Sequence, residues 1–341
     1  MTNKKHNAQF DTKTNASASE LSASQIRMIK PRPGQEHFIA DIDVSDAHTV
    51  DAVIAEIAPR SVWGEAWCYL RRRPLFWVSA TFILLAVIVA IAPGLFTHTD
   101  PRFCELSHSL EGPRAGHPFG FNRQGCDIYA RTLYGARTSV LVGVLTTLLV
   151  VFIGVTIGAL AGYFGGIIDT LLSRIVDIFY AVPLVLAAIV VMQVFKEHRT
   201  IITVVIALSI FGWTHIARIT RGVVLATKNE EFVTAARAVG ATHSKILLSH
   251  IVPNAAAPII VYATVVLGTV IVAEATLSFL GIGLPSSAIS WGADISAAQS
   301  SLRSQPMILF YPAAFLGLTV LSFIMMGDVV QDAFDPQSRQ K

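Results

Sequence analysis

The sequence predicts an all-α polytopic membrane protein with six transmembrane helices. Of its 341 residues, 53% are hydrophobic and 14% are charged, which is about half the charge of an ordinary soluble domain. Six uncharged apolar runs also approach or exceed the length of about 20 residues with which a helix crosses a bilayer. These runs are residues 74–99, 138–168, 178–195, 200–217, 246–273 and 304–327.

The composition argues against several classes of protein. Three cysteines and the absence of a CxxC or HExxH motif give no recognisable metal site. The 26 basic residues nearly balance the 23 acidic ones, which does not fit a nucleic-acid-binding protein. No GxSxG string and no paired acids lie within the apolar runs, so a membrane-embedded enzyme is not favoured. We expect no catalytic residue, no metal and no nucleic-acid partner.

Residues 1–60 are expected to form a cytoplasmic, largely disordered tail, because they lack the apolar periodicity that a packed core needs. No apolar segment follows Met1 as in a signal peptide. Residues 61–94 are expected to hold an interfacial helix and then the first transmembrane helix. Trp67 and Leu70 recur at helical spacing just before three consecutive arginines, which is typical of a helix in the lipid headgroup region.

Lysine and arginine are distributed unevenly over the connecting segments, and this asymmetry predicts the orientation. With the amino terminus inside, the inner segments hold 18 of these residues and the outer segments hold 8. Both termini are therefore expected in the cytoplasm of a multi-pass cell-membrane protein. Residues 95–138 become an extracytoplasmic loop, residues 139–335 the core of five further helices, and residues 336–341 the cytoplasmic end.

Two of the three cysteines, Cys104 and Cys126, fall in the predicted outer loop, whereas Cys68 falls on the inner side. Disulfides persist in oxidising compartments, so a bond between Cys104 and Cys126 is a hypothesis. The alternative is a mobile loop with two independent cysteines.

The cytoplasmic connection between the fourth and fifth spans, residues 218–254, is too long for a simple turn. Glu230 and Glu231 begin a short amphipathic helix whose apolar face holds four residues. They are Phe232, Ala235, Ala236 and Val239. Gly240 permits a chain reversal into a second short helix over residues 244–251, and Pro253 marks the start of the next span. Such a projecting helix is suited to a groove on another chain; the alternative is a connection that only joins two spans.

Within this connection the sequence resembles the EAA loop of ABC importer permeases. The run from Glu231 to Gly240 is EFVTAARAVG, and HIVPN follows from His250. The double alanine, Gly240 and Pro253 stand at the expected spacing. Thr234 occupies the position of the motif glutamate, and His250 that of an isoleucine.

The resemblance extends from about residue 63 to the carboxyl end, and it points to the C-type permease subunit of the dipeptide, oligopeptide and nickel importer family. Cys126 departs from the arginine expected between Gly125 and Asp127. The segments that carry the resemblance are residues 63–74, 117–120, 127–139, 161–169, 217–222, 250–254, 277–283 and 290–292.

The resemblance implies a type I ABC importer permease fold with cytoplasmic coupling helices. It also implies a second homologous permease subunit, two ABC ATPase subunits, an extracytoplasmic substrate-binding protein, a peptide substrate and membrane lipid as partners. This chain contains no GxxxxGK[ST] motif, so ATP and Mg²⁺ are expected on the ATPase chains, with no cofactor and no enzymatic activity here.

The resemblance further assigns ATPase coupling to the loop at residues 222–254, and within it to residues 231–253. The coupling residues are Glu231, Thr234, Ala235, Ala236, Arg237, Gly240, Lys245, His250 and Pro253. Arg237 and Lys245 are candidate ion-pair donors to the ATPase; the alternative is that both are solvated charges near lipid headgroups. Glu274, near the outer end of span five, is a candidate pathway residue for a peptide ammonium group, or else an interhelical hydrogen-bonding group.

Three other functions remain as alternatives. Nickel chelates and glutathione-like solutes are carried by importers of the same architecture. An ion-coupled secondary transporter, which needs no ATPase, predicts inverted repeats or several broken, charged spans. The sequence shows no convincing internal repeat.

Overall fold

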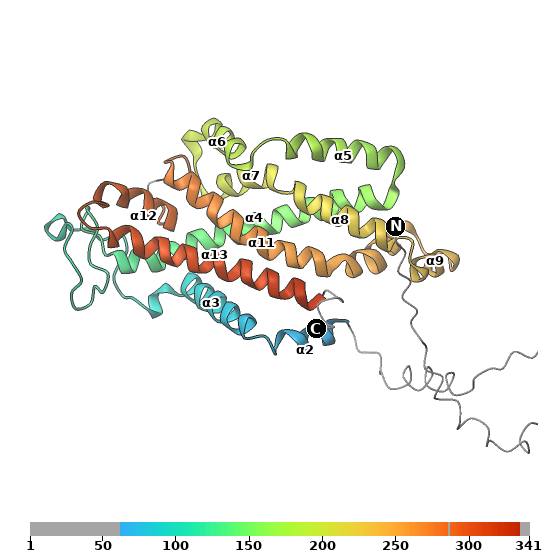
Figure 1. The fold of residues 1–341 in the computed structure, drawn as a ribbon. Helices are drawn as coiled ribbons and strands as arrows, with labels where there is room; N and C mark the ends of the chain where they lie inside the picture. Colours follow the sequence, from blue (N-terminus) through green and yellow to red (C-terminus); the bar gives the residue numbers. More distant parts are fainter. Residues whose placement is uncertain (1–61, 286, 335–341) are drawn as a thin grey trace, which may run out of the picture. The chain divides into compact units, whose positions relative to one another are not determined.

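The computed structural model describes residues 62–285 and 287–334. The predictions for the amino-terminal tail and for residues 336–341 lie outside these described residues. The described parts are almost entirely helical, and their only β-type pairings are three isolated bridges. Figure 1 shows the long helices α4, α11 and α13 side by side, with α12 towards one end and α9 at the other.

The helices follow the apolar runs of the sequence in order. The first six are α2 (Val62–Leu70), α3 (Pro74–Ile91), α4 (Ile128–Phe164), α5 (Gly166–Tyr180), α6 (Leu184–Val194) and α7 (Ile201–Gly212). The remainder are α8 (Thr214–Thr227), α9 (Glu231–Ala238), α10 (His243–Ile246), α11 (Val252–Phe279), α12 (Trp291–Ala298) and α13 (Met307–Phe334).

Four helices among the described residues are long and apolar enough to cross a membrane: α3, α4, the continuous helix His243–Phe279, and α13. Two further pairs qualify when each pair counts as one span. Helices α5 and α6 are bent by 81° relative to each other, and α7 and α8 by 46°. Each of the six predicted runs overlaps one of these helices or pairs, so the predicted all-α polytopic fold is confirmed.

The boundaries of the first two spans differ from the prediction. Helix α3 ends at Ile91 rather than at residue 99, because Pro93 follows and a 3-10 turn begins there. Helix α4 begins at Ile128, ten residues before the predicted span. Asp127 caps this start by accepting a hydrogen bond from the Tyr129 N–H, so the final part of the predicted outer loop is helical.

The hydropathy pattern alone suggests straight helices for the third and fourth spans, but both spans are bent helix pairs. The third begins at Gly166 and includes Asp169 and Asp177, which are paired with arginines of α8. It breaks before Pro183, where the helix α5 ends. Pairing with arginine lowers the free-energy cost of placing these two carboxylates in a membrane-spanning helix. The third span can therefore include them.

Helices α4 and α8 form the closest pair in the core because three glycines lie four residues apart on α4. A Cβ on Gly158 would lie 2.3 Å from the Ala217 carbonyl oxygen, and one on Gly154 would lie 2.8 Å from Ile216. Gly162 meets the backbone of Arg221 in the same way. Small residues at this spacing let two helix backbones approach closely in a membrane. The largest apolar cluster extends from this contact to α6, α7 and α11.

Helix α2 lies against the last helix of the chain. Ala66 and Leu70 are buried in a cluster with Val329 and Ala333 of α13. Trp67 is exposed on the other side, next to the exposed residues Arg71–Arg73. This one-sided packing is the arrangement of an amphipathic helix with an aromatic and basic outer surface.

Candidate functional site

Helix α9 is anchored to the rest of the chain by one buried side chain. Val233 packs with Ile246, Ile251 and Val224, and the same cluster includes Ala159 and Tyr163 of α4. These partners come from α4, α8 and the start of the His243–Phe279 helix. The short helix is therefore tied to three membrane-spanning elements through a continuous apolar contact.

The apolar face predicted for this helix is largely the face that the chain leaves uncovered. Phe232 is 41% exposed and Val239 is 89% exposed, and Ala235 is also exposed. Ala236 is half-buried. The predicted apolar face did not include Val233, which lies between the predicted positions and makes the internal contact. The remaining apolar side chains form a surface that is suited to another chain.

Gly240 ends α9 in a Schellman motif. Its φ is +83°, and its N–H donates to the Arg237 carbonyl while the Ala241 N–H donates to the Ala236 carbonyl. This hydrogen-bond pattern needs a left-handed residue at the position that Gly240 occupies. The chain reverses at this glycine, as the sequence predicted.

The predicted second short helix over residues 244–251 is wrong as a separate element. Thr242 caps the start by accepting from the Lys245 N–H, and the helix then runs without a break from His243 to Phe279. A π-helical turn, Leu247–Ile251, lies just before Pro253. This wider turn accommodates the missing proline N–H, so Pro253 lies within the long helix instead of marking its start.

The polar residues of this region divide into two groups. His243 lies 2.8 Å from the Tyr163 hydroxyl, and Lys228 donates to the Gly162 carbonyl at 2.9 Å; both contacts fix the end of α4. Glu231, Thr234 and Lys245 are exposed. Neither Glu231 nor Lys245 has an ion-pair partner within the described residues.

Arg237 and His250 complete the predicted coupling set. The Arg237 guanidinium lies 6.0 Å from the centre of the Tyr163 ring, within the range of a cation–π contact. His250 lies in the π-helical turn, and its carbonyl accepts from the Asn254 side chain at 2.6 Å. The set therefore surrounds one uncovered helix and the turn that follows it.

Glu274 is enclosed by helices of this chain, and its role as a pathway residue stays a prediction. Its side chain is fully buried at 0% exposure. It accepts hydrogen bonds from Ser278 at 2.8 Å and from Ser139 of α4 at 3.1 Å. The alternative prediction, an interhelical hydrogen-bonding group, describes the observed contacts.

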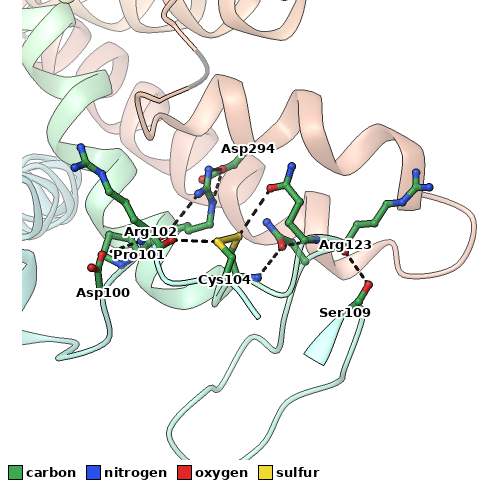
Figure 2. Close-up of a disulfide and its surroundings, with 11 residues drawn as sticks. Asp100, Pro101, Arg102, Cys104, Ser109, Arg123 and Asp294 are labelled. Atoms are coloured by element: carbon green, nitrogen blue, oxygen red, sulfur yellow. Dashed lines mark hydrogen bonds and ion pairs between the residues drawn. A yellow bond between two sulfur atoms is a disulfide. The ribbon is translucent and has the colours of Figure 1, made fainter. Parts of the chain in front are cut away.

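At the opposite end of the molecule, Cys104 and Cys126 form a disulfide (Figure 2). Gly125 stands beside it with φ +75°, and a Cβ there would lie 1.9 Å from the Glu105 carbonyl oxygen. Asn122 accepts hydrogen bonds from the Cys126 and Gln124 N–H groups. We refer to this part of the molecule as the disulfide end, and to the part with α9 as the α9 end.

An ion pair joins the disulfide end to the core. The Arg131 Nε of α4 donates to Asp294 Oδ1 of α12 at 2.8 Å, and Figure 2 shows Asp294 near the disulfide. Burial raises the pKa of the Asp294 carboxyl, and the Arg131 guanidinium acts in the opposite direction. Trp291 of α12 also donates to the Thr132 carbonyl at 2.8 Å. Helix α12 is therefore fixed to the start of α4.

Comparison with known proteins identifies related families and relatives. Residues 154–340 match the family described as binding-protein-dependent transport system inner membrane component. Residues 61–113 match the N-terminal TM domain of oligopeptide transport permease C. The chain is 39% identical over 280 residues to the oligopeptide transport system permease protein OppC of Bacillus subtilis, covering 82% of this chain and 91% of that protein.

Two further relatives are similar over the same extent. The dipeptide transport system permease protein DppC of Alkalihalophilus pseudofirmus is 37% identical over 282 residues, covering 82% of this chain and 91% of that protein. The glutathione transport system permease protein GsiD of Escherichia coli O157:H7 is 37% identical over 283 residues, with the same coverage of both chains.

Proposed function

Because the chain belongs to the family of binding-protein-dependent transport system inner membrane components, we propose that it is a permease subunit of an ATP-driven peptide importer. The family resemblance drawn from the sequence is thereby confirmed. The peptide assignment is supported by relatives that are named for oligopeptide and dipeptide transport. In this proposal the chain forms half of a translocation pathway.

The observation that carries the proposal is helix α9, which is anchored on one side and uncovered on the other. Val233 is packed among residues of α4, α8 and the fifth span, while Phe232 and Val239 remain exposed. A helix of this kind transmits a push from a docked partner to the spans as a rigid body. ATP binding and hydrolysis then occur on the docked ATPase chains, and this chain needs no nucleotide or metal of its own.

The same proposal sets the orientation of the molecule. The α9 end faces the cytoplasm, where ATPase subunits have access to it, and the disulfide end faces the extracytoplasmic side. The excess of lysine and arginine on the inner segments supports this orientation. The Cys104–Cys126 bond is also suited to an oxidising compartment.

The partners in this assignment are a second homologous permease, two ABC ATPases and an extracytoplasmic substrate-binding protein. ATP favours the outward-facing state to the extent that the closed ATPase dimer fits that state better. A glutathione-like peptide is the second candidate substrate, because one of the relatives is named for glutathione transport.

The decisive experiment purifies the tagged chain in mild detergent from its own membranes and identifies the co-purifying chains by mass spectrometry. We expect a second permease and one or two P-loop ATPases. Their ATPase activity in proteoliposomes is then measured with the substrate-binding protein and either trialanine or glutathione. A chain that is recovered alone and transports after reconstitution without ATP would overturn the importer assignment.

A further inference from the structure

Four polar side chains form a line on the surface of the membrane-spanning helices. Tyr180 ends α5, His215 and Arg218 belong to α8, and Tyr262 belongs to α11. The His215 ring centre lies 5.0 Å from that of Tyr180 and 6.1 Å from that of Tyr262. The Arg218 guanidinium lies 3.8 Å from the Tyr180 ring centre. Three separate spans thus contribute to one polar line.

This line lies well inside the spans. With a rise of about 1.5 Å per residue, Tyr262 is about 28 Å from the start of the His243–Phe279 helix and about 25 Å from its end. His215 lies about 21 Å from Ile201 and about 18 Å from Thr227 by the same measure, disregarding the bend between α7 and α8. The hydrocarbon core of a bilayer is about 30 Å thick, so both side chains are at membrane depth.

These side chains are not suited to contact with lipid tails. Tyr180 is 45% exposed, and His215 and Arg218 are exposed as well. No described residue forms a hydrogen bond with the side chain of Tyr180, His215 or Tyr262. Each unsatisfied polar group costs several kcal/mol in hydrocarbon. The face that carries them must therefore meet water or another chain.

The exposed neighbours on the same helices are different. Ile178 is 67% exposed two residues before Tyr180, and Ile260 is 46% exposed two residues before Tyr262. Apolar side chains of this kind can contact lipid tails without an unpaired polar group. Each of these two helices therefore carries one polar and one apolar residue at almost the same depth; Tyr180 is exposed and Tyr262 is half-buried.

A charged cavity adjoins the polar line and indicates water on this face. It has a volume of about 550 Å³ and lies between α4, α5 and α8. Its wall includes Asp169, Asp177, Arg218 and Arg221, and Arg218 is also a member of the line. A cavity lined by several charged groups is large and polar enough to hold water. The polar line is thus continuous with a hydrated space.

We propose that Tyr180, His215, Arg218 and Tyr262 line the aqueous translocation pathway and contact the passing peptide. This assignment rests on the proposed importer function. The two hydroxyls and the imidazole offer hydrogen bonds to peptide amide groups of any sequence. Arg218 donates to Asp177 at 2.8 Å, so its charge is already compensated and does not trap a peptide carboxylate. Transport requires contacts that are weak enough to release the solute.

The test measures water access with single cysteines in the assembled complex. Cys68 is the only free cysteine among the described residues, so Cys68→Ser is the background. Tyr180→Cys and Tyr262→Cys are compared with the matched controls Ile178→Cys and Ile260→Cys. The complex, in lipid nanodiscs that leave both faces accessible, is treated with the charged reagent MTSET, and labelling is read as the mass shift of the intact chain.

We expect the two pathway positions to react about tenfold or more faster than the controls, since only a hydrated thiol ionises and reacts with the reagent. Equal rates at Tyr262→Cys and Ile260→Cys, or no reaction at the pathway positions, would show that lipid or the partner permease seals this face. Either result would overturn the pathway assignment.

Uptake of trialanine or glutathione by the Cys68→Ser background complex in proteoliposomes separates this inference from the proposed function. Rapid labelling at the pathway positions without trialanine or glutathione uptake would leave the hydrated face intact and refute the peptide importer. Trialanine uptake without labelling would support the importer and refute the pathway assignment. The thermal unfolding temperature of each variant is measured in parallel, so that a misfolded variant is recognised and replaced by His215→Cys.

Discussion

The two ends of the molecule are held together by different contacts. At the disulfide end, Cys104 is bonded to Cys126, and Asp294 is paired with Arg131 within the same chain. At the α9 end, Phe232 and Val239 are exposed. Covalent and ionic contacts within the chain hold the disulfide end together, whereas α9 is held by the buried side chain of Val233 and leaves Phe232 and Val239 to a partner chain.

This difference shows where the fold supports stability and where it supports association. Changes at the disulfide end should lower the stability of the chain. Changes on the outer face of α9 should leave the fold intact and weaken assembly.

Gly240→Val should abolish ATP-driven uptake while the chain still inserts in the membrane. The φ of +83° is strained for a β-branched residue by about 1–3 kcal/mol, so the turn after α9 must change direction. Uptake in proteoliposomes measures the effect. Gly240→Asn is the control, because asparagine tolerates the left-handed region; wild-type uptake by Gly240→Val would refute the role of this turn.

Asp294→Asn should destabilise the chain by about 3 kcal/mol, because it leaves the largely buried Arg131 guanidinium without its counter-charge. Thermal unfolding followed by tryptophan fluorescence in detergent measures the loss. Glu197→Gln removes an acid from an exposed pair and should change stability by less than about 0.5 kcal/mol. An equally small change for Asp294→Asn would mean that this end does not depend on the ion pair.

Replacing Cys104 and Cys126 together by serine should destabilise the disulfide end by about 3 kcal/mol, the chain-entropy estimate for a bond that spans 22 residues. Limited proteolysis should then cut within residues 104–126 more rapidly than in the wild type. Cutting near α9 should not change. Reduction of the wild-type chain should reproduce the result, and unchanged proteolysis would show that the bond is dispensable for this fold.

Phe232→Ala should weaken ATPase association about tenfold, in keeping with the loss of a partly exposed aromatic anchor at an interface. The stability of the chain itself should remain within about 0.5 kcal/mol of the wild type. The binding of purified ATPase to the permease in nanodiscs measures the association. Ile167→Ala, which alters an exposed apolar residue outside α9, is the control and should bind normally; equal loss in both variants would locate the docking surface elsewhere.

The sequence predicted the helical fold well because apolar length depends only on local composition. It predicted less well where helices break and at which residues the spans begin and end. The predicted runs left Asp169 and Asp177 outside the spans, between residues 168 and 178, but both pair with arginines of α8 and lie within the third span. Pro253 was predicted to begin a span, but a π-helical turn lets the helix continue through it. In both cases a contact or a change of helix geometry outweighed a local rule.

In the candidate sites, too, local features were predicted from the sequence and tertiary contacts were not. The sequence placed Gly240 in a left-handed turn and α9 in the long connection, because motif spacing and glycine chemistry are local properties. It did not predict that Val233 would anchor α9, and it left Glu274 open between a pathway residue and the buried interhelical hydrogen-bonding group that is observed. Those outcomes depend on which helices become neighbours.

The sequence by itself determined the membrane class, the six apolar segments and the family, since hydropathy and the order of motifs are properties of the linear chain. Only the tertiary structure decided that Tyr180, His215 and Tyr262 lie together on one face. These residues are far apart in the chain, and each is unremarkable within its own helix. Their proximity follows from helix packing, which is set by close contacts such as Gly158 against Ala217.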